Sequence, residues 1–282
     1  MDKVLLINKD KGYTSRDVVN IISKKLNEKK VGHFGTLDPL ATGLLVIGIG
    51  RLTKLGNLLS DETKDYEVEV LLGTSTDTYD ITGKTIKTSA NFNKEKIKTE
   101  LLKLKTTYNQ EVPPYSAVKI NGKKLYEYAR NNEKVDLPKK EVTIFDINSI
   151  TFKTKDKRDY LTFNCSVSKG TYIRSLINDL SKKTNTPMCM SNLKRTRCGT
   201  FFLKDAYTLE EITNDNFKVL DITDCLDIDK KEIPSNLETK ILNGAEIDMT
   251  NSKMILFTKD SNYIALYGNY KNKMKPYLTF KK

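Results

Sequence analysis

Apolar positions repeat with helical spacing in three parts of the chain. After Thr14, whose hydroxyl can cap free amide groups, apolar residues recur at every fourth position, which predicts a helix over residues 14–26. Residues 93–104 follow the same rule behind the capping residue Asn93. Within residues 173–180, apolar side chains stand at offsets 0, 3, 4 and 7, so a third amphipathic helix is expected there.

Short apolar or alternating runs predict strands between and beyond these helices. We expect strands over residues 4–8, 44–49, 66–72, 141–152, 160–168, 254–258 and 263–267. Residues 31–43 hold three glycines and a proline among polar residues, which indicates an irregular loop. Because strands and helices are mixed without a strict repeat, and the strand pairs lack regular crossover helices, the sequence predicts an α+β fold with a large mixed, mainly antiparallel sheet.

The amino-acid composition restricts the possible partners and types of site more than the predicted helices and strands do. The 282 residues carry a formal net charge of +12, which favours a polyanionic partner such as nucleic acid. A single histidine argues against most zinc sites and against histidine-based catalytic triads. The four cysteines form no CxxC pair, and no run approaches about 20 apolar residues, so we expect reduced thiols and no membrane span.

Charge is distributed unevenly and indicates two unequal domains. Residues 181–204 contain six basic residues and no acid, whereas residues 205–232 contain nine acids against three lysines and are interpreted as a peripheral connector. The last fourteen residues hold five lysines and three aromatic residues, which indicates a small β-rich module with a basic face.

One loop carries a motif that a plain turn would not need. The run GHFGTLDPLATG resembles the catalytic signature of the pseudouridine synthases, in the TruB branch that modifies uridine 55 in the T loop of tRNA. The resemblance continues in order through NKDKGYTS, DYEVEVLLGTSTDTYDITG, PPYSAVKINGKKLYEYAR, VSKGTYIRSLINDL and LKRTRCGTF. In the first of these, Asp10 stands where a proline is usual.

The resemblance implies a role for five side chains. Asp38 corresponds to the catalytic carboxylate, acting either as a nucleophile or as the base that takes a sugar proton. Arg174 matches the family's arginine, whose guanidinium would hold that carboxylate ionised and oriented. Tyr66 would lie against the target base, Leu193 would contact the uracil, and His33 would fill the place of displaced T-loop nucleotides.

The resemblance also implies a division of the chain and a set of phosphate contacts. It places a catalytic domain at residues 1–231, with a tRNA-binding insertion at about residues 113–138, and a PUA-like RNA-binding domain at residues 232–282. About six phosphate contacts would give a slope of roughly −4 to −5 for log K against log salt. The phosphate candidates are Lys9, Lys119, Lys123, Lys124, Arg130, Lys194 and Arg195.

The function implied is isomerisation of uridine 55 in tRNA on a flipped-out nucleotide, without a metal or nucleotide cofactor. We expect a cytoplasmic enzyme that binds the T stem and T loop and needs no guide RNA or obligate protein partner. Two alternatives remain open. One is a relative that modifies ribosomal RNA with a guide RNA, and the other is an RNA-binding or chaperone protein in which catalysis is dispensable.

Overall fold

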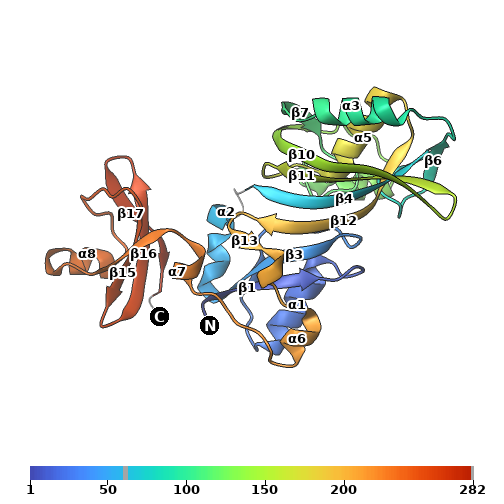
Figure 1. Cartoon of the computed structure of the whole chain (residues 1–282). Coiled ribbons are helices and arrows are strands. Elements are labelled where there is room, and N and C mark those ends of the chain that lie inside the picture. The colour runs from blue at the N-terminus through green and yellow to red at the C-terminus, as the bar shows by residue number, and fades with distance from the viewer. Residues whose placement is uncertain (60–62, 281–282) are drawn as a thin grey trace.

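A mixed sheet forms the larger part of the molecule. The computed structural model describes residues 1–59 and 63–280, and in these residues the large sheet has nine strands (Figure 1). Along its main path the order is β1 (Lys3–Lys9), β3 (Thr42–Ile49), β12 (Met188–Cys198), β4 (Lys64–Leu72), β11 (Arg158–Val167), β10 (Lys139–Lys155) and β7 (Thr107–Glu111). Off that path, β2 (Val31–His33) pairs with β3, and β13 (Phe201–Phe202) pairs with β12. Among the described strands of this large sheet, only β3 and β12 pair in parallel, which confirms the expected mixed, mainly antiparallel sheet.

Side-chain alternation explains how this sheet divides its two faces. In β4, Tyr66, Val68 and Val70 are buried, whereas Glu67 and Glu69 point to the other face. The buried face is covered by α1 (Ser15–Lys25), α3 (Lys94–Lys103) and α5 (Ile173–Thr184), whose apolar residues join the same core as the inner residues of β4. The sequence predicted all three helices, because their stripes match this single face.

Two capping residues named from the sequence begin their helices as expected. The Thr14 hydroxyl accepts from the backbone N–H of Asp17, whose carboxylate accepts in return from the Thr14 N–H, which closes a capping box. The Asn93 side chain accepts from the N–H of Lys96 at the start of α3. Each cap satisfies amide groups that the first helical turn leaves without partners.

The remaining elements are short and lie around the large sheet. They are η1 (Gly50–Leu55), α2 (Gly56–Leu59), β5 (Thr74–Thr76), β6 (Thr85–Thr88), β8 (Lys119–Ile120), β9 (Lys123–Lys124), α4 (Leu125–Arg130), η2 (Leu203–Asp205), α6 (Leu209–Thr213) and α7 (Ile222–Cys225). β5 pairs with β6 and β8 pairs with β9, so each pair forms a small two-stranded sheet. In the part of the chain described, no helix is long and apolar enough to cross a membrane.

Two sequence interpretations were wrong in detail. Residues 31–43 are not wholly irregular, because β2 adds three residues to the edge of β3. Residues 205–232 are not merely peripheral, because the backbone at Leu220 pairs with Val4, and that at Tyr207 with Ile7. Both segments lack strong periodicity, so the pattern of the sequence alone did not place them against the sheet.

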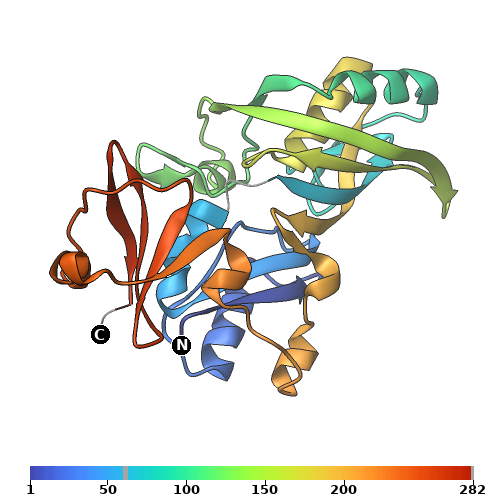
Figure 2. The ribbon, with the colours of Figure 1, turned by 60° about the vertical axis from the view of Figure 1, so that its left-hand side comes forward.

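A second, four-stranded sheet forms the C-terminal lobe (Figure 2). Its order is β14 (Ile228–Glu232), β15 (Met254–Lys259), β16 (Asn262–Tyr270) and β17 (Lys273–Thr279), with η3 (Ser235–Leu237) and α8 (Glu238–Leu242) between β14 and β15. The expected boundary between residues 231 and 232 falls within β14, which pairs with β15 and so belongs to the C-terminal sheet.

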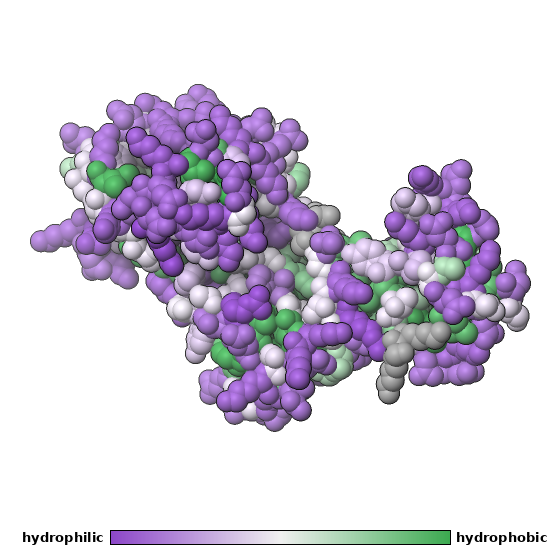
Figure 3. Space-filling model, turned by 180° about the vertical axis from the view of Figure 1, so that it is seen from behind, coloured by the Kyte–Doolittle hydropathy of each residue, from purple (hydrophilic) through white to green (hydrophobic). Residues whose placement is uncertain are grey.

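The C-terminal lobe packs on the second face of the large sheet. Leu256, Leu266 and Leu278 share one apolar core with residues of β1, β3, η1 and α2. The Tyr277 hydroxyl also donates to the Lys54 carbonyl, 3.2 Å away. Seen from behind, the surface of both lobes is covered largely by hydrophilic residues, with only scattered apolar patches (Figure 3). The two sheets therefore share an interior.

Candidate active site

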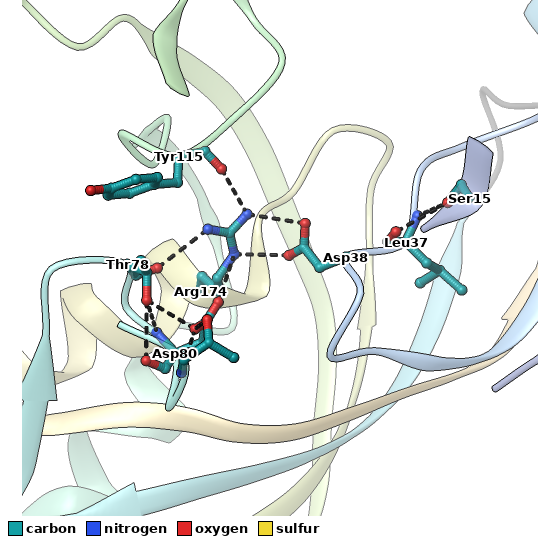
Figure 4. A network of polar contacts seen from close by, with 8 residues as sticks. Ser15, Leu37, Asp38, Thr78, Asp80, Tyr115 and Arg174 are labelled. Atoms are coloured by element: carbon teal, nitrogen blue, oxygen red, sulfur yellow. Dashed lines mark hydrogen bonds and ion pairs between the residues drawn. The ribbon is translucent and has the colours of Figure 1, made fainter. Parts of the chain in front are cut away.

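The loop that carries Asp38 is fixed from both sides. On the N-terminal side, the Ser15 hydroxyl donates to the Leu37 carbonyl at 3.0 Å and accepts from the Leu37 N–H at 2.8 Å (Figure 4). On the C-terminal side, the Gly12 N–H donates to the Pro39 carbonyl at 2.8 Å. Because Ser15 is the first residue of α1, the start of this helix holds the Asp38 loop in place.

The guanidinium of Arg174 meets the Asp38 carboxylate along an edge. Arg174 Nε lies 2.9 Å from Asp38 Oδ2, and Arg174 Nη2 lies 3.2 Å from Asp38 Oδ1. The remaining donors reach backbone carbonyls, with Nη1 3.3 Å from the oxygen of Thr78 and Nη2 3.1 Å from that of Tyr115 (Figure 4). Arg174 is 6% exposed and the Asp38 side chain 35% exposed, so the carboxylate remains open to a ligand.

Asp80 is a second carboxylate beside Arg174, and the sequence analysis did not select it. Its Oδ2 lies 4.0 Å from Arg174 Nε, and its Oδ1 accepts from the hydroxyl of Thr78 and from the N–H and hydroxyl of Thr82. Asp80 is 6% exposed, so it contributes a negative charge from within the protein. The family-like run through residues 65–83 contained the signal, but the run alone did not show which residue faces the arginine.

Tyr66 lies on the helix-covered face of β4 and is 7% exposed. Burial raises the pKa of Tyr66, and the nearby Arg195 guanidinium opposes this shift. Leu193, on the adjacent strand β12, is 6% exposed and belongs to the same apolar core. Tyr66 and Leu193, the two expected base contacts, therefore belong to the same apolar core as Leu37 of the Asp38 loop.

His33 closes β2, directly before the Asp38 loop. Burial lowers the pKa of His33, and the positive charges of Arg16 and Arg195 lower it further. Its Nδ1 is buried and has no hydrogen-bond partner within residues 1–59 and 63–280. A neutral imidazole in this position can pack against a base without carrying charge to it.

Two of the expected phosphate contacts are wrong. Lys9 is 0% exposed, and its Nζ donates to the carbonyls of Asp10 at 2.9 Å and Tyr13 at 2.8 Å. Arg195 is 1% exposed, with Nε donating to the Leu44 carbonyl and Nη2 to the Gly35 carbonyl. These two basic residues therefore fill space in the interior near the Asp38 loop and are not accessible to a phosphate.

The parallel contact of β3 and β12 brings the backbone of Arg195 close against Gly43. Gly43 has φ +96° and pairs with Arg195, and a Cβ built on Gly43 would lie 2.3 Å from the Arg195 carbonyl oxygen. Only glycine tolerates both this backbone conformation and the close approach. The last glycine of the GHFGTLDPLATG run therefore lets the two strands meet beside the Asp38 loop.

The pH dependence of stability should reveal the buried ammonium group of Lys9. Burial lowers its pKa from 10.5 to about 8, so above pH 8 the unfolded chain binds more protons than the folded one, and stability rises with pH. From pH 7.5 to 9.5, the loss of the Lys9 proton should add about 2 kcal/mol to the free energy of unfolding. Urea unfolding of the wild type and Lys9→Met at both pH values measures it. An equal pH response in both proteins would contradict this assignment.

The other expected phosphate contacts are accessible. Lys119 and Arg130 are exposed, and Lys123 and Lys124 are partly exposed, all on β8, β9 and α4 of the insertion. Lys123 Nζ lies 4.6 Å from the ring centre of Tyr128, and Lys124 and Arg130 both stack over Tyr126. Lys194 is partly exposed on β12, 3.5 Å from Glu67. The insertion thus presents an accessible mixture of cations and aromatic rings.

The described residues offer no clear metal site and no accessible thiol. Among the residues described, no three or more His, Cys, Asp or Glu side chains gather in a way that could hold a metal ion. The four cysteines are free and buried, and burial raises the pKa of Cys189 and of Cys225 to about 12. The cysteines are therefore interior residues, which agrees with the expectation of reduced thiols.

Comparison with known proteins places this geometry in a family. The family model described as "TruB family pseudouridylate synthase (N terminal domain)" matches residues 23–173. Curated proteins named tRNA pseudouridine synthase B are similar over almost the whole chain. The one from Lactobacillus acidophilus is 38% identical and covers 95% of this chain and 94% of its own. Those from Caldanaerobacter subterraneus subsp. tengcongensis and Staphylococcus aureus are both 39% identical, covering 96% and 94% of this chain and 92% and 93% of their own.

Solved structures agree on the fold. A chain from an H/ACA RNP bound to a substrate RNA containing 2′-deoxyuridine has a TM-score of 0.67 at 19% identity, and covers 99% of this chain and 85% of its own. A chain from a Cbf5-Nop10-Gar1 complex has a TM-score of 0.67 at 21% identity, with coverage of 99% and 84%. Together with the sequence matches, these likenesses show that the chain has the pseudouridine synthase fold and belongs to the TruB family of pseudouridylate synthases.

Proposed function

We propose that this protein converts uridine 55 in the T loop of tRNA to pseudouridine, with Asp38 as the catalytic carboxylate. The observation that carries the proposal is the two-point pairing of Asp38 with the buried Arg174 in the loop of the family signature. It is supported by the names of the relatives, which are tRNA pseudouridine synthases. A tRNA substrate also accords with the net charge of +12, and it would imply a cytoplasmic location.

The reaction needs positioned protein groups and no change of oxidation state. The N1–C1′ bond breaks, the uracil turns, the C5–C1′ bond forms, and the C5 proton leaves while N1 gains one. Asp38 would act as a nucleophile or take a sugar proton, and Arg174 would keep its carboxylate oriented in either case. Tyr66, Leu193 and His33 would receive the base and the displaced loop nucleotides. We assign no step to a metal ion or nucleotide cofactor.

The proposed domain roles follow from the accessible charges. The insertion at residues 113–138 would bind the tRNA backbone through its cations, and its aromatic rings would offer stacking surfaces. The C-terminal lobe would be a PUA-like RNA-binding domain. Here Lys275 Nζ lies 3.5 Å from the ring centre of the exposed Tyr270, which gives the tip of β16 and β17 the same combination of a cation and an aromatic ring. Guide RNA and obligate protein partners have no part in this proposal.

Salt dependence tests which cations meet phosphates. With Lys9 and Arg195 buried, five accessible candidates remain, so the slope of log K against log salt should be about −4. Replacing Lys119, Lys124 and Arg130 together by Met should make the slope less steep by about 2 units. Filter binding at several salt concentrations measures both slopes. Removing the exposed Lys98, Lys157 and Lys218 is the charge-matched control and should change the slope much less.

Mapping modified uridines in an unmodified tRNA transcript tests the function. Carbodiimide labelling followed by primer extension should give a stop at U55 and at no other uridine, without added guide RNA. A transcript with U55 changed to C is the control and should give no stop. Modification of ribosomal RNA only with a guide RNA would support the guided relative instead, and tight binding without any modified uridine would support the chaperone alternative.

A further inference from the structure

A buried chain of polar groups links β7 to the helix that carries Arg174. Gln110, in β7, is 1% exposed. Its Oε1 accepts from the backbone N–H of Tyr172 at 2.8 Å, and its Nε2 donates to the Tyr108 hydroxyl at 2.9 Å. The Tyr108 hydroxyl in turn donates to Asp179 Oδ2, 3.1 Å away. Gln110 and Tyr108 of β7 thus contact α5 at two places about two turns apart, Tyr172 and Asp179.

The chemistry of each group fixes the direction of every bond in this chain. Burial raises the pKa of Tyr108, and Asp179 raises it further, so the phenol keeps its proton. Because that proton goes to Asp179, the phenol oxygen is left to accept from Gln110 Nε2. The amide oxygen of Gln110 then faces the backbone N–H of Tyr172. Gln110 therefore has one productive orientation, set by its neighbours.

The start of α5 depends on this outside acceptor. In α1 and α6, a side chain in the first helical turn accepts from the N–H of the capping residue. In α5 the capping residue is Tyr172, which makes no side-chain cap, and the residue three positions on is Ser175. Among the described residues, the Ser175 hydroxyl has no hydrogen-bond partner. Gln110 supplies from β7 the acceptor that this helix lacks.

The contact points bracket the catalytic arginine. Tyr172 and Asp179 are seven residues apart, which is about two turns or roughly 10 Å along one face of the helix. Tyr108 and Gln110 are two residues apart and so project from the same face of β7. Arg174 lies between the two contact points, and its guanidinium also donates to the carbonyl of Tyr115, just beyond β7. β7 and the segment that follows it thus contact both the backbone at the start of α5 and the guanidinium of Arg174.

We propose that Gln110 is a positioning residue, which sets the Arg174 guanidinium against Asp38 by holding the first turn of α5 in register with β7. This inference rests on the proposed function, because it assigns Arg174 to the reaction. Gln110 touches no reacting atom. It acts because a guanidinium that shifts by a fraction of an ångström loses the two-point contact with the carboxylate.

Steady-state kinetics on a tRNA transcript test the inference. Gln110→Met keeps the length of the side chain but removes its polar groups, and should lower kcat by about 10- to 100-fold with KM for tRNA within about twofold. Tyr108→Phe leaves the Gln110 contact with Tyr172 but removes the hydroxyl that accepts from Gln110 Nε2. It should lower kcat by roughly 3- to 10-fold. Asn109→Met, on the exposed face of the same strand, is the matched control and should match wild type. All assays run below the melting temperature of each variant.

A double-mutant cycle separates positioning from general stability. In an Arg174→Lys background the guanidinium is gone, so adding Gln110→Met should lower the single-turnover rate by less than about twofold. An equal fractional loss in both backgrounds would overturn the inference, as would an unchanged kcat in Tyr108→Phe and a well-folded Gln110→Met. Wild-type activity that depends on Asp38 would still support the proposed function in that case, whereas an inactive wild type would contradict the function itself.

Discussion

Asp38→Asn is expected to lower the rate of pseudouridine formation by about 10⁴-fold, the scale seen when a residue that forms or breaks bonds is removed. Asparagine keeps the size of the side chain but can neither attack carbon nor take a proton at neutral pH. Asp38 is the carboxylate of the pair that is open to a ligand, at 35% exposed against 8% for the Asp80 side chain, so no neighbour can replace it. Single-turnover assays with excess enzyme measure this loss directly.

Binding distinguishes a catalytic role from a structural one for Asp38. The affinity for tRNA should stay within about threefold of wild type, because the proposed phosphate contacts lie on the insertion and at Lys194, and a lost negative charge does not repel RNA. Asp10→Asn is the matched control, since Asp10 is exposed and near the same loop, and it should leave the rate unchanged within about twofold. Turnover by Asp38→Asn above a few per cent of wild type would show that another group performs the chemistry.

Arg174→Lys is expected to lower kcat by about 10²- to 10³-fold while KM changes by less than about threefold. The guanidinium spans four acceptors at once, namely both Asp38 oxygens and the carbonyls of Thr78 and Tyr115. A lysine ammonium carries the same charge but only one nitrogen, so it cannot hold the carboxylate at two points. The loss should therefore appear in kcat rather than in binding.

The control for this substitution is another arginine replaced by lysine. Arg158 is exposed at the start of β11, away from the Asp38 loop, and Arg158→Lys should match wild type in both kcat and KM. If Arg174→Lys also retained full kcat, charge alone would suffice and the planar two-point contact would have no role in the reaction. Thermal melts of both variants show that the comparison concerns folded protein.

Periodicity predicted those elements whose side chains alternate between one buried face and one exposed face. The helices α1, α3 and α5 and the strand β4 each show such a pattern, and all four join the same core. It failed for segments without a regular repeat, such as the chain at Leu220, whose N–H and carbonyl both bond to Val4 and whose side chain packs against the second apolar core. No side-chain pattern records that attachment.

The resemblance to the family implied the pairing of Asp38 with Arg174, and this ion pair is present. The resemblance did not show which of the other motif residues are buried. Lys9 and Arg195 were assigned to phosphates because lysine and arginine are usually exposed, but here their donors are used by backbone carbonyls. Gln110 was missed altogether, because an amide on a strand gives no signal until the helix that it contacts has been placed.

The apolar interior shared by the two sheets has a consequence for substrate selection. Leu256, Leu266 and Leu278 would be exposed to water if the C-terminal lobe swung away, so this contact works against a hinge at the junction. In the proposed function, the RNA-binding surfaces of the two lobes would then stay at a fixed separation. An RNA whose helical arm is too short or too long would not reach both surfaces, so the protein would select RNA by length before any base is read.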